Sequence, residues 1–278
     1  MPLFNKVNLP SRIGKNEPIE SCVIFVHGLA GSTKTWEAFS SHLAKQWIYD
    51  ESFGLEYDLY TIDSKIPIYG FLKRWLLAGP KIEVLANSFN TVINEVCKEY
   101  TNVIIVAHSM GGLVARQYLV DLVKRTKEVG KVKGLITYAT PHKGSNIATL
   151  YKNIGLSYFD IPFGLLSRQV VQMCREESDF IRQLNMDWDA LRIDQKIDFR
   201  SVVGERDFIV DSESASLGIS LYDSISNKDH FNIIKPVVAK DPAFMITFNY
   251  LKDFKRNLER KAEIEELNIL AEEEDAAD

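Results

Sequence analysis

The sequence predicts an α/β protein built on a mostly parallel sheet that is flanked by helices. Short apolar, β-branched segments with almost no charge recur along the chain, which is typical of strands buried on both faces of a parallel sheet. Amphipathic helical patterns lie between these segments, as the crossover connections of such a sheet require. The length of 278 residues suits one large α/β domain or two small ones.

Four strong strand candidates and one weaker candidate carry this prediction. Residues 21–28 (SCVIFVHG) and 102–109 (NVIIVAHS) are dominated by branched apolar side chains. Residues 132–140 and 197–204 repeat the pattern, and residues 57–64 form the weaker candidate. We expect these segments to pair in one doubly wound sheet.

Helical patterns fill the intervals between the strand candidates. Residues 32–47 open with a Ser-Thr pair that can cap a first turn, and apolar residues then recur at helical spacing. Residues 80–100 start with a proline and carry one apolar stripe, and residues 111–128 form a third helical pattern. Each strand candidate is thus connected to the next in the manner of a βαβ unit.

One insertion and two terminal segments interrupt the alternation. Residues 143–195 break it, and they include residues 153–167, which are apolar but punctuated by Gly and Pro. This pattern predicts a helical cap or lid, and a peripheral helical subdomain without functional motion is the alternative. We expect residues 1–20 to be an N-terminal extension, residues 21–255 to form the α/β domain, and residues 256–278 to end a helix in an acidic tail.

Composition and charge exclude several classes of protein. The net charge of −5 provides no basic surface for nucleic acid. No apolar run approaches the roughly 18 residues that cross a bilayer, and none in the first twenty residues has signal-peptide length. The three cysteines match no metal-binding spacing and cannot all pair. The sequence therefore predicts a cytoplasmic protein, and it leaves the oligomeric state open.

The stretch AHSMGG, residues 107–112, ends a predicted strand and places Ser109 at the turn into a helix. Such a turn strains the backbone, and only small residues fit two positions to either side of the serine, where Ala107 and Gly111 stand. Ser109 is therefore the candidate nucleophile, and the backbone N–H of Met110 is a candidate oxyanion donor at the helix N-terminus. The alternative is a strand-turn-helix unit that merely contains a serine.

A second oxyanion donor is expected from the loop FVHGLAGS, residues 25–32. In this architecture the donor comes from the loop after an earlier strand, and Gly28 permits the bend that turns the N–H of Leu29 inward. The side chain of His27 is then expected to make structural hydrogen bonds. An ordinary turn at the end of a strand is the alternative.

A serine hydroxyl needs a general base, and the chain has five histidines. We expect His108 to point to the face opposite Ser109 and His42 to lie on a helix surface. His142, in ATPHKGS, could approach the site from the side. In a sheet of this type the chain order is Ser, acid, His, and His230 is the histidine that leaves room for an intervening acid. We therefore predict His230 as the base.

Asp207 is the predicted orienting acid. It lies three residues after Gly204, at the carboxyl edge of the predicted strand 197–204, where catalytic groups gather in parallel sheets. Asp211 is the alternative acid, and a turn-forming role is the alternative for Asp207. Asp229 would face away from the imidazole of its neighbour.

Taken in order, the motifs HGLAGS, AHSMGG, TPHKGS, GERDFIV and DHFNIIKP resemble those of α/β-hydrolases over roughly residues 20–255. The sequence is similar to serine esterases and lipases, and in particular to PGAP-like and SERAC-like lipid hydrolases. The resemblance implies an α/β-hydrolase fold with a helical lid insertion. It also implies a triad of Ser109, His230 and Asp207 that cleaves carboxylic esters through an acyl-enzyme, without a metal or other cofactor. Ala107 replaces the first glycine of the usual motif, a change that is conservative in size.

The predicted substrate is a lipid or another long-chain acyl ester. Apolar side chains of the insertion could line an acyl-chain tunnel, among them Phe159, Phe163 and Leu165. Residues 68–80 could contact a membrane surface transiently, so the protein could be peripheral to a membrane. Ordinary core packing is the alternative for both segments. An acyltransferase that uses the same triad, and a non-catalytic binding or signalling module, are the alternative functions.

Overall fold

The computed structural model describes most of the α/β body and its C-terminal helix. The described residues are 3–7, 19–29, 31–49, 57–63, 80–145, 168–174, 178–217 and 222–275. The segment 153–167 of the predicted lid therefore lies outside the described residues, and so do nearly all of residues 68–80.

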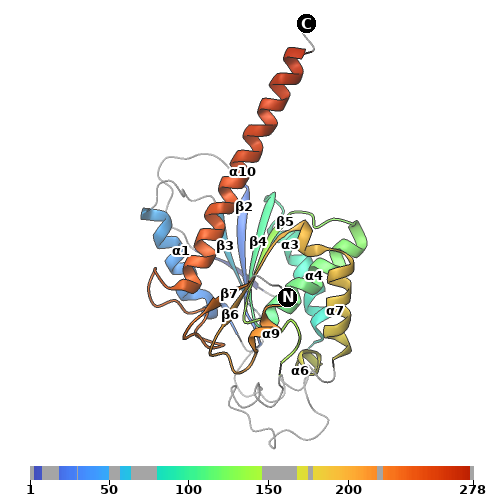
Figure 1. Cartoon of the computed structure of the whole chain (residues 1–278), viewed down its shortest axis with the longest axis vertical. Helices are drawn as coiled ribbons and strands as arrows, with labels where there is room; N and C mark the ends of the chain where they lie inside the picture. The colour runs from blue at the N-terminus through green and yellow to red at the C-terminus, as the bar shows by residue number, and fades with distance from the viewer. Residues whose placement is uncertain are drawn as a thin grey trace, which may run out of the picture.

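Within the described residues, seven strands form one sheet in the order β1-β3-β2-β4-β5-β6-β7 (Figure 1). β1 runs antiparallel to β3, and every other neighbouring pair is parallel. The strands are β1 (Leu3–Lys6), β2 (Ser21–Val26), β3 (Tyr57–Asp63), β4 (Asn102–His108), β5 (Val132–Tyr138), β6 (Asp198–Gly204) and β7 (Asp223–Ile225).

Two strands of this sheet lie outside the sequence-based expectation. β1 belongs to the segment predicted as an N-terminal extension, and β7 has only three residues. Both lie at the sheet edges, where a strand needs few apolar residues, so their sequences lack the pattern of a buried strand.

The central strands are buried at every position because helices cover both faces of the sheet. Alternate side chains of β2 enter different cores: Ile24 and Val26 face one, and Val23 and Phe25 face the other. This is the two-residue alternation of a strand, and each such side chain contributes about 1.5–3 kcal/mol when fully buried. The continuous apolar runs in the sequence therefore result from burial on both faces.

Helices α3, α4 and α7 pack on one face of the sheet, and α1 and α10 pack on the other (Figure 1). α7 lies within the predicted lid insertion, yet Ile181, Leu184 and Trp188 bury in the same core as α3 and α4. The helices are η1 (Thr33–Trp36), α1 (Glu37–Tyr49), α3 (Ile82–Val96), α4 (Met110–Thr126), α6 (Arg168–Met173), α7 (Asp179–Ala190), α8 (Ile193–Lys196), α9 (Ser212–Ala215) and α10 (Pro242–Asp275).

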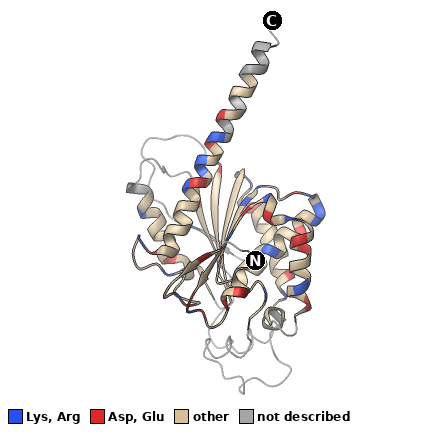
Figure 2. Ribbon diagram, in the orientation of Figure 1, with Lys and Arg blue, Asp and Glu red and all other residues tan. Residues whose placement is uncertain are grey.

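The last helix is longer than the sequence pattern indicates. Its first turns bury Phe244 and Leu251 against the sheet, and its second half projects from the body (Figure 1). Acidic and basic side chains alternate along its middle (Figure 2), where Lys255 and Glu259 form an i,i+4 pair at 3.6 Å. Helix-favouring Glu, Ala and Leu continue the helix through the predicted acidic tail to Asp275.

None of the helices that the structure describes combines the length and apolar character required to cross a bilayer.

Candidate active site

Ser109 occupies the sharp turn between β4 and α4. Its backbone has φ 53° and ψ −128°, a conformation that L-residues rarely adopt. Two hydrogen bonds hold it there: the Ser109 N–H donates to the Tyr138 carbonyl at 2.9 Å, and the Gly112 N–H donates to the Ser109 carbonyl at 3.0 Å. Such a conformation costs about 1–3 kcal/mol and persists only where the surrounding structure imposes it.

Two glycines, Gly28 and Gly111, pack against this turn so closely that neither position leaves room for a side chain. A Cβ at Gly111 would lie 2.7 Å from the His27 carbonyl oxygen, and a Cβ at Gly28 would lie 2.7 Å from Cβ of Ser109. The loop after β2 is therefore in contact with the serine. Because these approaches are so close, glycine is required at both positions.

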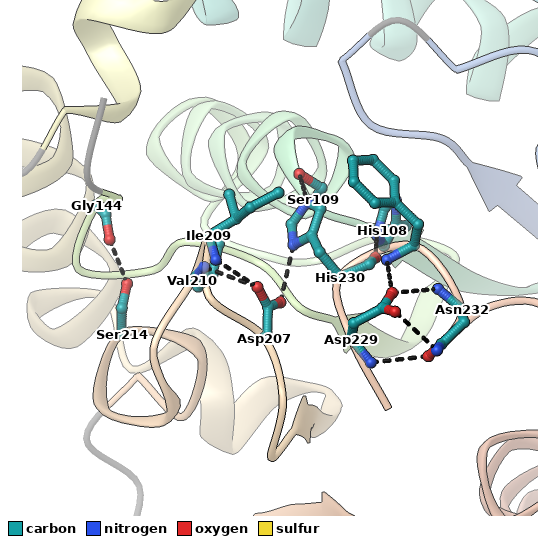
Figure 3. Close-up of polar contacts among 11 residues, drawn as sticks. His108, Ser109, Gly144, Asp207, Ile209, Val210, Ser214, Asp229, His230 and Asn232 are labelled. Atoms are coloured by element: carbon teal, nitrogen blue, oxygen red, sulfur yellow. Dashed lines mark hydrogen bonds and ion pairs between the residues drawn. The ribbon is translucent and has the colours of Figure 1, made fainter. Parts of the chain in front are cut away.

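The hydroxyl, the imidazole and the carboxylate form a continuous hydrogen-bonded series (Figure 3). Nε2 of His230 lies 3.0 Å from Oγ of Ser109, and Nδ1 of His230 lies 2.8 Å from Oδ2 of Asp207. All three side chains are buried. A carboxylate only accepts, so the ring proton resides on Nδ1, and Nε2 carries the lone pair that can take the hydroxyl proton.

Backbone groups hold the carboxylate of Asp207 in place. Its Oδ1 accepts the N–H groups of Ile209 and Val210, each at 2.9 Å (Figure 3). These two bonds leave Oδ2 for the imidazole of His230. The carboxylate is therefore oriented before any substrate arrives.

Two loops at the carboxyl edge of the sheet bring the predicted acid and the predicted base together. Asp207 follows β6 by three residues, and His230 follows β7 by five. The loops are bonded to each other, since the Arg206 N–H donates to the Lys228 carbonyl at 2.9 Å. They also approach closely, since a Cβ at Gly204 would lie 2.5 Å from that same carbonyl oxygen.

The two other aspartates that were considered serve local turns. Oδ1 of Asp211 accepts the N–H of Ser214 at 2.7 Å and caps α9. Oδ1 of Asp229 accepts the N–H groups of the two residues that follow His230, at 2.8 and 2.9 Å. The structure thus places Asp207 beside the imidazole and occupies the other two carboxylates elsewhere.

His108 lies on the same rim as the triad, so the expectation that it points to the opposite face is wrong. Its Nε2 lies 2.7 Å from the His230 carbonyl oxygen, and the two rings are 4.9 Å apart. Side-chain alternation ends at the strained backbone of Ser109, and both side chains therefore reach one rim. Burial, followed by the proximity of His230, lowers the pKa of His108 well below 6.5, and the neutral ring donates to the backbone of His230.

The predicted oxyanion donors flank Ser109 in the chain fold. Met110 is the first residue of α4, where backbone N–H groups lack partners within the helix. Leu29 lies in a turn closed by a 3.2 Å bond from the Gly31 N–H to the Gly28 carbonyl. The nitrogen atom Nδ1 of His27 lies 2.8 Å from the Gly28 oxygen, in keeping with a structural role. That Leu29 and Met110 bind an oxyanion stays a prediction.

His142 does not approach the site from the side. It is fully buried, with Nδ1 3.1 Å from a guanidinium nitrogen of Arg116 and Nε2 3.0 Å from Oγ1 of Thr137. Arg116 does not stand out in the sequence, because a charged residue in a helix is usually exposed. Its position on the strongly apolar first half of α4 was the available signal.

The three residues predicted to contact the acyl chain, Phe159, Phe163 and Leu165, lie outside the described residues, so that contact stays a prediction. Within the described residues, no group of three or more His, Cys, Asp or Glu side chains could hold a metal ion.

A family model described as the PGAP1-like alpha/beta domain matches residues 18–159, just over half of the chain. Among curated proteins, SERAC1 of Danio rerio is 28% identical over 275 residues, covering 86% of this chain and 40% of that protein. Human SERAC1 is 23% identical over 255 residues, covering 83% of this chain and 38% of that protein. The chain thus spans about two fifths of the length of these relatives.

Solved structures share the fold. The mature lipase BlEst2 of Bacillus licheniformis has a TM-score of 0.60 at 18% identity, covering 90% of this chain and 98% of that one. Phospholipase PlaB of Legionella pneumophila has a TM-score of 0.63 at 15% identity, covering 83% of this chain and 59% of that one. The predicted α/β-hydrolase fold is confirmed, and the predicted resemblance is confirmed with it.

Proposed function

Because the chain belongs to the family of the PGAP1-like alpha/beta domain, we propose that it is a serine hydrolase that cleaves carboxylic esters. The observation that supports this most directly is the series from Asp207 through His230 to Ser109, with contacts of 2.8 and 3.0 Å. A hydroxyl in contact with an oriented, neutral imidazole is an activated nucleophile.

The proposed reaction has two acyl-transfer steps. His230 takes the hydroxyl proton as Oγ of Ser109 attacks the ester carbonyl, and Asp207 stabilises the imidazolium that forms. The N–H groups of Leu29 and Met110 bind the oxyanion, each contributing about 10²–10³ in rate. The alcohol leaves with the proton from His230. Water, deprotonated by the same imidazole, then releases the acid, and no cofactor is needed.

We propose a lipid or another long-chain acyl ester as the substrate. Two exposed aromatic side chains adjoin the acid and the base: Phe208 is 81% exposed, and Phe231 is 42% exposed. Their neighbours Asp207 and His230 are buried, so apolar surface lies next to the reacting groups. The names of two structural neighbours, a lipase and a phospholipase, favour the same class. Transient membrane contact and a cytoplasmic location belong to this proposal.

Labelling with a fluorophosphonate tests the nucleophile. The wild-type protein should react at Ser109, and Ser109→Ala should abolish both labelling and ester hydrolysis. Ser226→Ala is the matched control, because Ser226 is exposed at the same sheet edge and donates to Glu205 at 2.8 Å. A folded wild-type protein without label at Ser109 would favour a non-catalytic binding module.

A series of p-nitrophenyl esters from about two to sixteen carbons tests the substrate class. Hydrolysis should increase with chain length, and a maximum at the shortest esters would contradict the lipid preference. Product analysis with added alcohols or amines separates hydrolysis from acyl transfer. Predominant transfer to the added acceptor would indicate an acyltransferase that uses the same triad.

A further inference from the structure

A buried guanidinium lies about two turns beyond the nucleophile on α4. Arg116 has no exposed surface, and it stacks over the ring of Trp188 at 4.6 Å. Its Nη2 donates to Oδ1 of Asn185 at 2.9 Å, and its Nη1 lies 3.1 Å from Nδ1 of His142. Among the described residues, no carboxylate lies within ion-pair distance of it. Its direct partners are therefore neutral groups, and the carboxylate of Asp189 acts on it only at longer range.

The contacts of His142 determine its protonation. A guanidinium only donates, so Nδ1 accepts from Arg116 and the ring proton resides on Nε2, 3.0 Å from Oγ1 of Thr137. Burial, followed by the charge of Arg116, lowers the pKa of His142 well below 6.5. Asn185 completes the network by donating Nδ2 to the His142 carbonyl at 2.9 Å. The neutral imidazole of His142 thus accepts a hydrogen bond from the guanidinium of Arg116 on α4.

The loop that carries His142, residues 139–145, contacts the nucleophile helix at one end. Thr140 packs on Gly112, three residues after Ser109, so closely that any Cβ there would collide with its Oγ1. The His142 N–H donates to the Thr140 carbonyl at 2.8 Å, which joins this contact to the buried network.

The same loop contacts the segment that carries the orienting acid (Figure 3). Oγ of Ser214 donates to the Gly144 carbonyl at 2.6 Å and accepts the N–H of Lys143 at 3.1 Å. Ser214 belongs to α9, which begins five residues after Asp207. The loop 139–145 therefore connects the helix of Ser109 to the segment of Asp207.

We propose that Arg116 and His142 are positioning residues for the triad, which is a role that rests on the proposed function. Their buried contacts fix the loop 139–145, and the loop fixes the separation between the nucleophile helix and the acid segment. Proton transfer depends on that separation, because a misplacement of about 1 Å can cost on the order of 10² in rate.

The first test replaces the cation by an apolar side chain of similar length. Arg116→Met should lower the melting temperature somewhat, because Nδ1 of His142 and Oδ1 of Asn185 lose their donor, so its kinetics are measured well below that temperature. Its kcat should fall about tenfold or more, with KM within about twofold. Arg200→Met is the matched control: Arg200 stacks on Tyr250 at 5.1 Å, on β6, and its loss should leave kcat unchanged.

Two substitutions of the imidazole separate positioning from bulk structure. In His142→Asn the amide oxygen can replace Nδ1 and accept from Arg116, whereas in His142→Gln the amide reaches toward Thr137 instead. The Asn variant should retain most of the wild-type kcat, and the Gln variant should lose about as much as Arg116→Met. Equal losses in both variants, together with a lower melting temperature, would assign a merely structural role and overturn the proposal.

A spectroscopic measurement makes the test independent of turnover. The proton on Nδ1 of His230, bonded to Asp207 at 2.8 Å, should give a downfield proton resonance that is absent in His230→Gln. His142→Gln should shift or broaden it, and His142→Asn should not. If the wild-type protein shows this resonance but neither hydrolyses esters nor reacts with the probe, the proposed function fails while the positioning role is still decided. An unchanged resonance and an unchanged kcat in both Arg116→Met and His142→Gln would refute the positioning role of Arg116 and His142.

Discussion

The carboxyl edge and the amino edge of the sheet, where the parallel strands end and begin, each hold a polar cluster around one buried aspartate. At the carboxyl edge, Asp207 accepts from His230, which contacts Ser109. At the amino edge, Oδ2 of Asp58 accepts from Nζ of Lys6 at 2.7 Å and from the hydroxyl of Tyr100 at 2.5 Å. Both aspartate side chains are largely buried and hydrogen-bonded, although Lys6 is half exposed, and only the first cluster has the arrangement of a hydroxyl with a candidate base.

The two clusters differ in the side chain that contacts the aspartate, which is an imidazole in one and a phenol in the other. They also differ in the backbone conformation of the third residue. Burial raises the pKa of Tyr100 and of Tyr60, whose hydroxyls are 2.7 Å apart, so these groups keep their protons. A neutral imidazole, by contrast, donates a proton at one nitrogen and accepts one at the other. Tyr60 also lies in a regular strand, whereas Ser109 is held at positive φ. Burial and hydrogen bonding alone therefore do not create a reactive group.

The largest effect is expected from a substitution that disrupts the carboxyl-edge cluster alone. Asp207→Asn should lower kcat by about 10⁴, because the amide no longer selects the imidazole tautomer that accepts the serine proton. Asp58→Asn should leave kcat within about twofold of wild type, since nothing at the amino edge touches the reacting atoms. Steady-state kinetics on one ester decides the matter. Similar losses in the two variants would show that the edges are not functionally distinct.

The second effect is the pH dependence of stability, which should differ in direction between two buried histidines, His108 and His142, and the tyrosines of the amino-edge cluster. His108 and His142 stay neutral in the fold, while the unfolded chain protonates them below about pH 6.5. The free energy of unfolding should therefore fall on acidification, by about 1.4 kcal/mol per histidine between pH 7.5 and 5.5.

The amino edge should lose stability at the opposite end of the pH range. Tyr60 and Tyr100 stay protonated in the fold, while unfolded tyrosines ionise above about pH 10, so stability falls as pH rises. Urea unfolding across pH measures both limbs. His142→Asn should flatten the acidic limb and Tyr100→Phe the alkaline one, and the reverse assignment would contradict this account.

A smaller effect sharpens the comparison from the amino edge. Tyr100→Phe removes one of the donors to Asp58 and should lower the free energy of unfolding by about 1–3 kcal/mol, without change in kcat. Tyr222→Phe is the control, because Tyr222 is 41% exposed and its loss should be nearly neutral. Denaturation and ester hydrolysis are measured on the same samples, and a drop in kcat would contradict a purely structural role.

The smallest expected effect concerns the backbone strain at the carboxyl edge. Ser109→Gly and Ser109→Ala both remove the hydroxyl, but glycine adopts φ near 53° without penalty. The Gly variant should therefore be more stable than the Ala variant by about 1 kcal/mol in urea unfolding. Equal stabilities would indicate that the turn stores little strain.

Much of the fold could be predicted from the sequence, because strands buried on both faces produce continuous apolar runs. The positions of Ser109 and Asp207 at strand ends followed from the same logic, since parallel strands share one carboxyl edge, and His230 followed from the chain order Ser, acid, His. Their contacts are now located, and their catalytic roles await the measurements above.

What the sequence could not provide depends on contacts between distant segments. The alternation of a regular strand predicts the wrong face for His108, because that alternation does not extend past the strained turn at Ser109. The network of Arg116 requires α7, which carries Asn185 and Trp188, to pack beside α4, and no local pattern encodes that contact. The edge strand β1 escaped notice because it has only four residues.

The two glycines that pack against Ser109 limit which positions can be varied in directed evolution of this protein. Any side chain at Gly28 or Gly111 would collide with atoms less than 3 Å away, so libraries at those positions would be depleted before selection begins. Diversity intended to alter substrate preference belongs instead at Phe208, which is 81% exposed, whereas Phe231 packs edge-on against the ring of His230 at 5.3 Å.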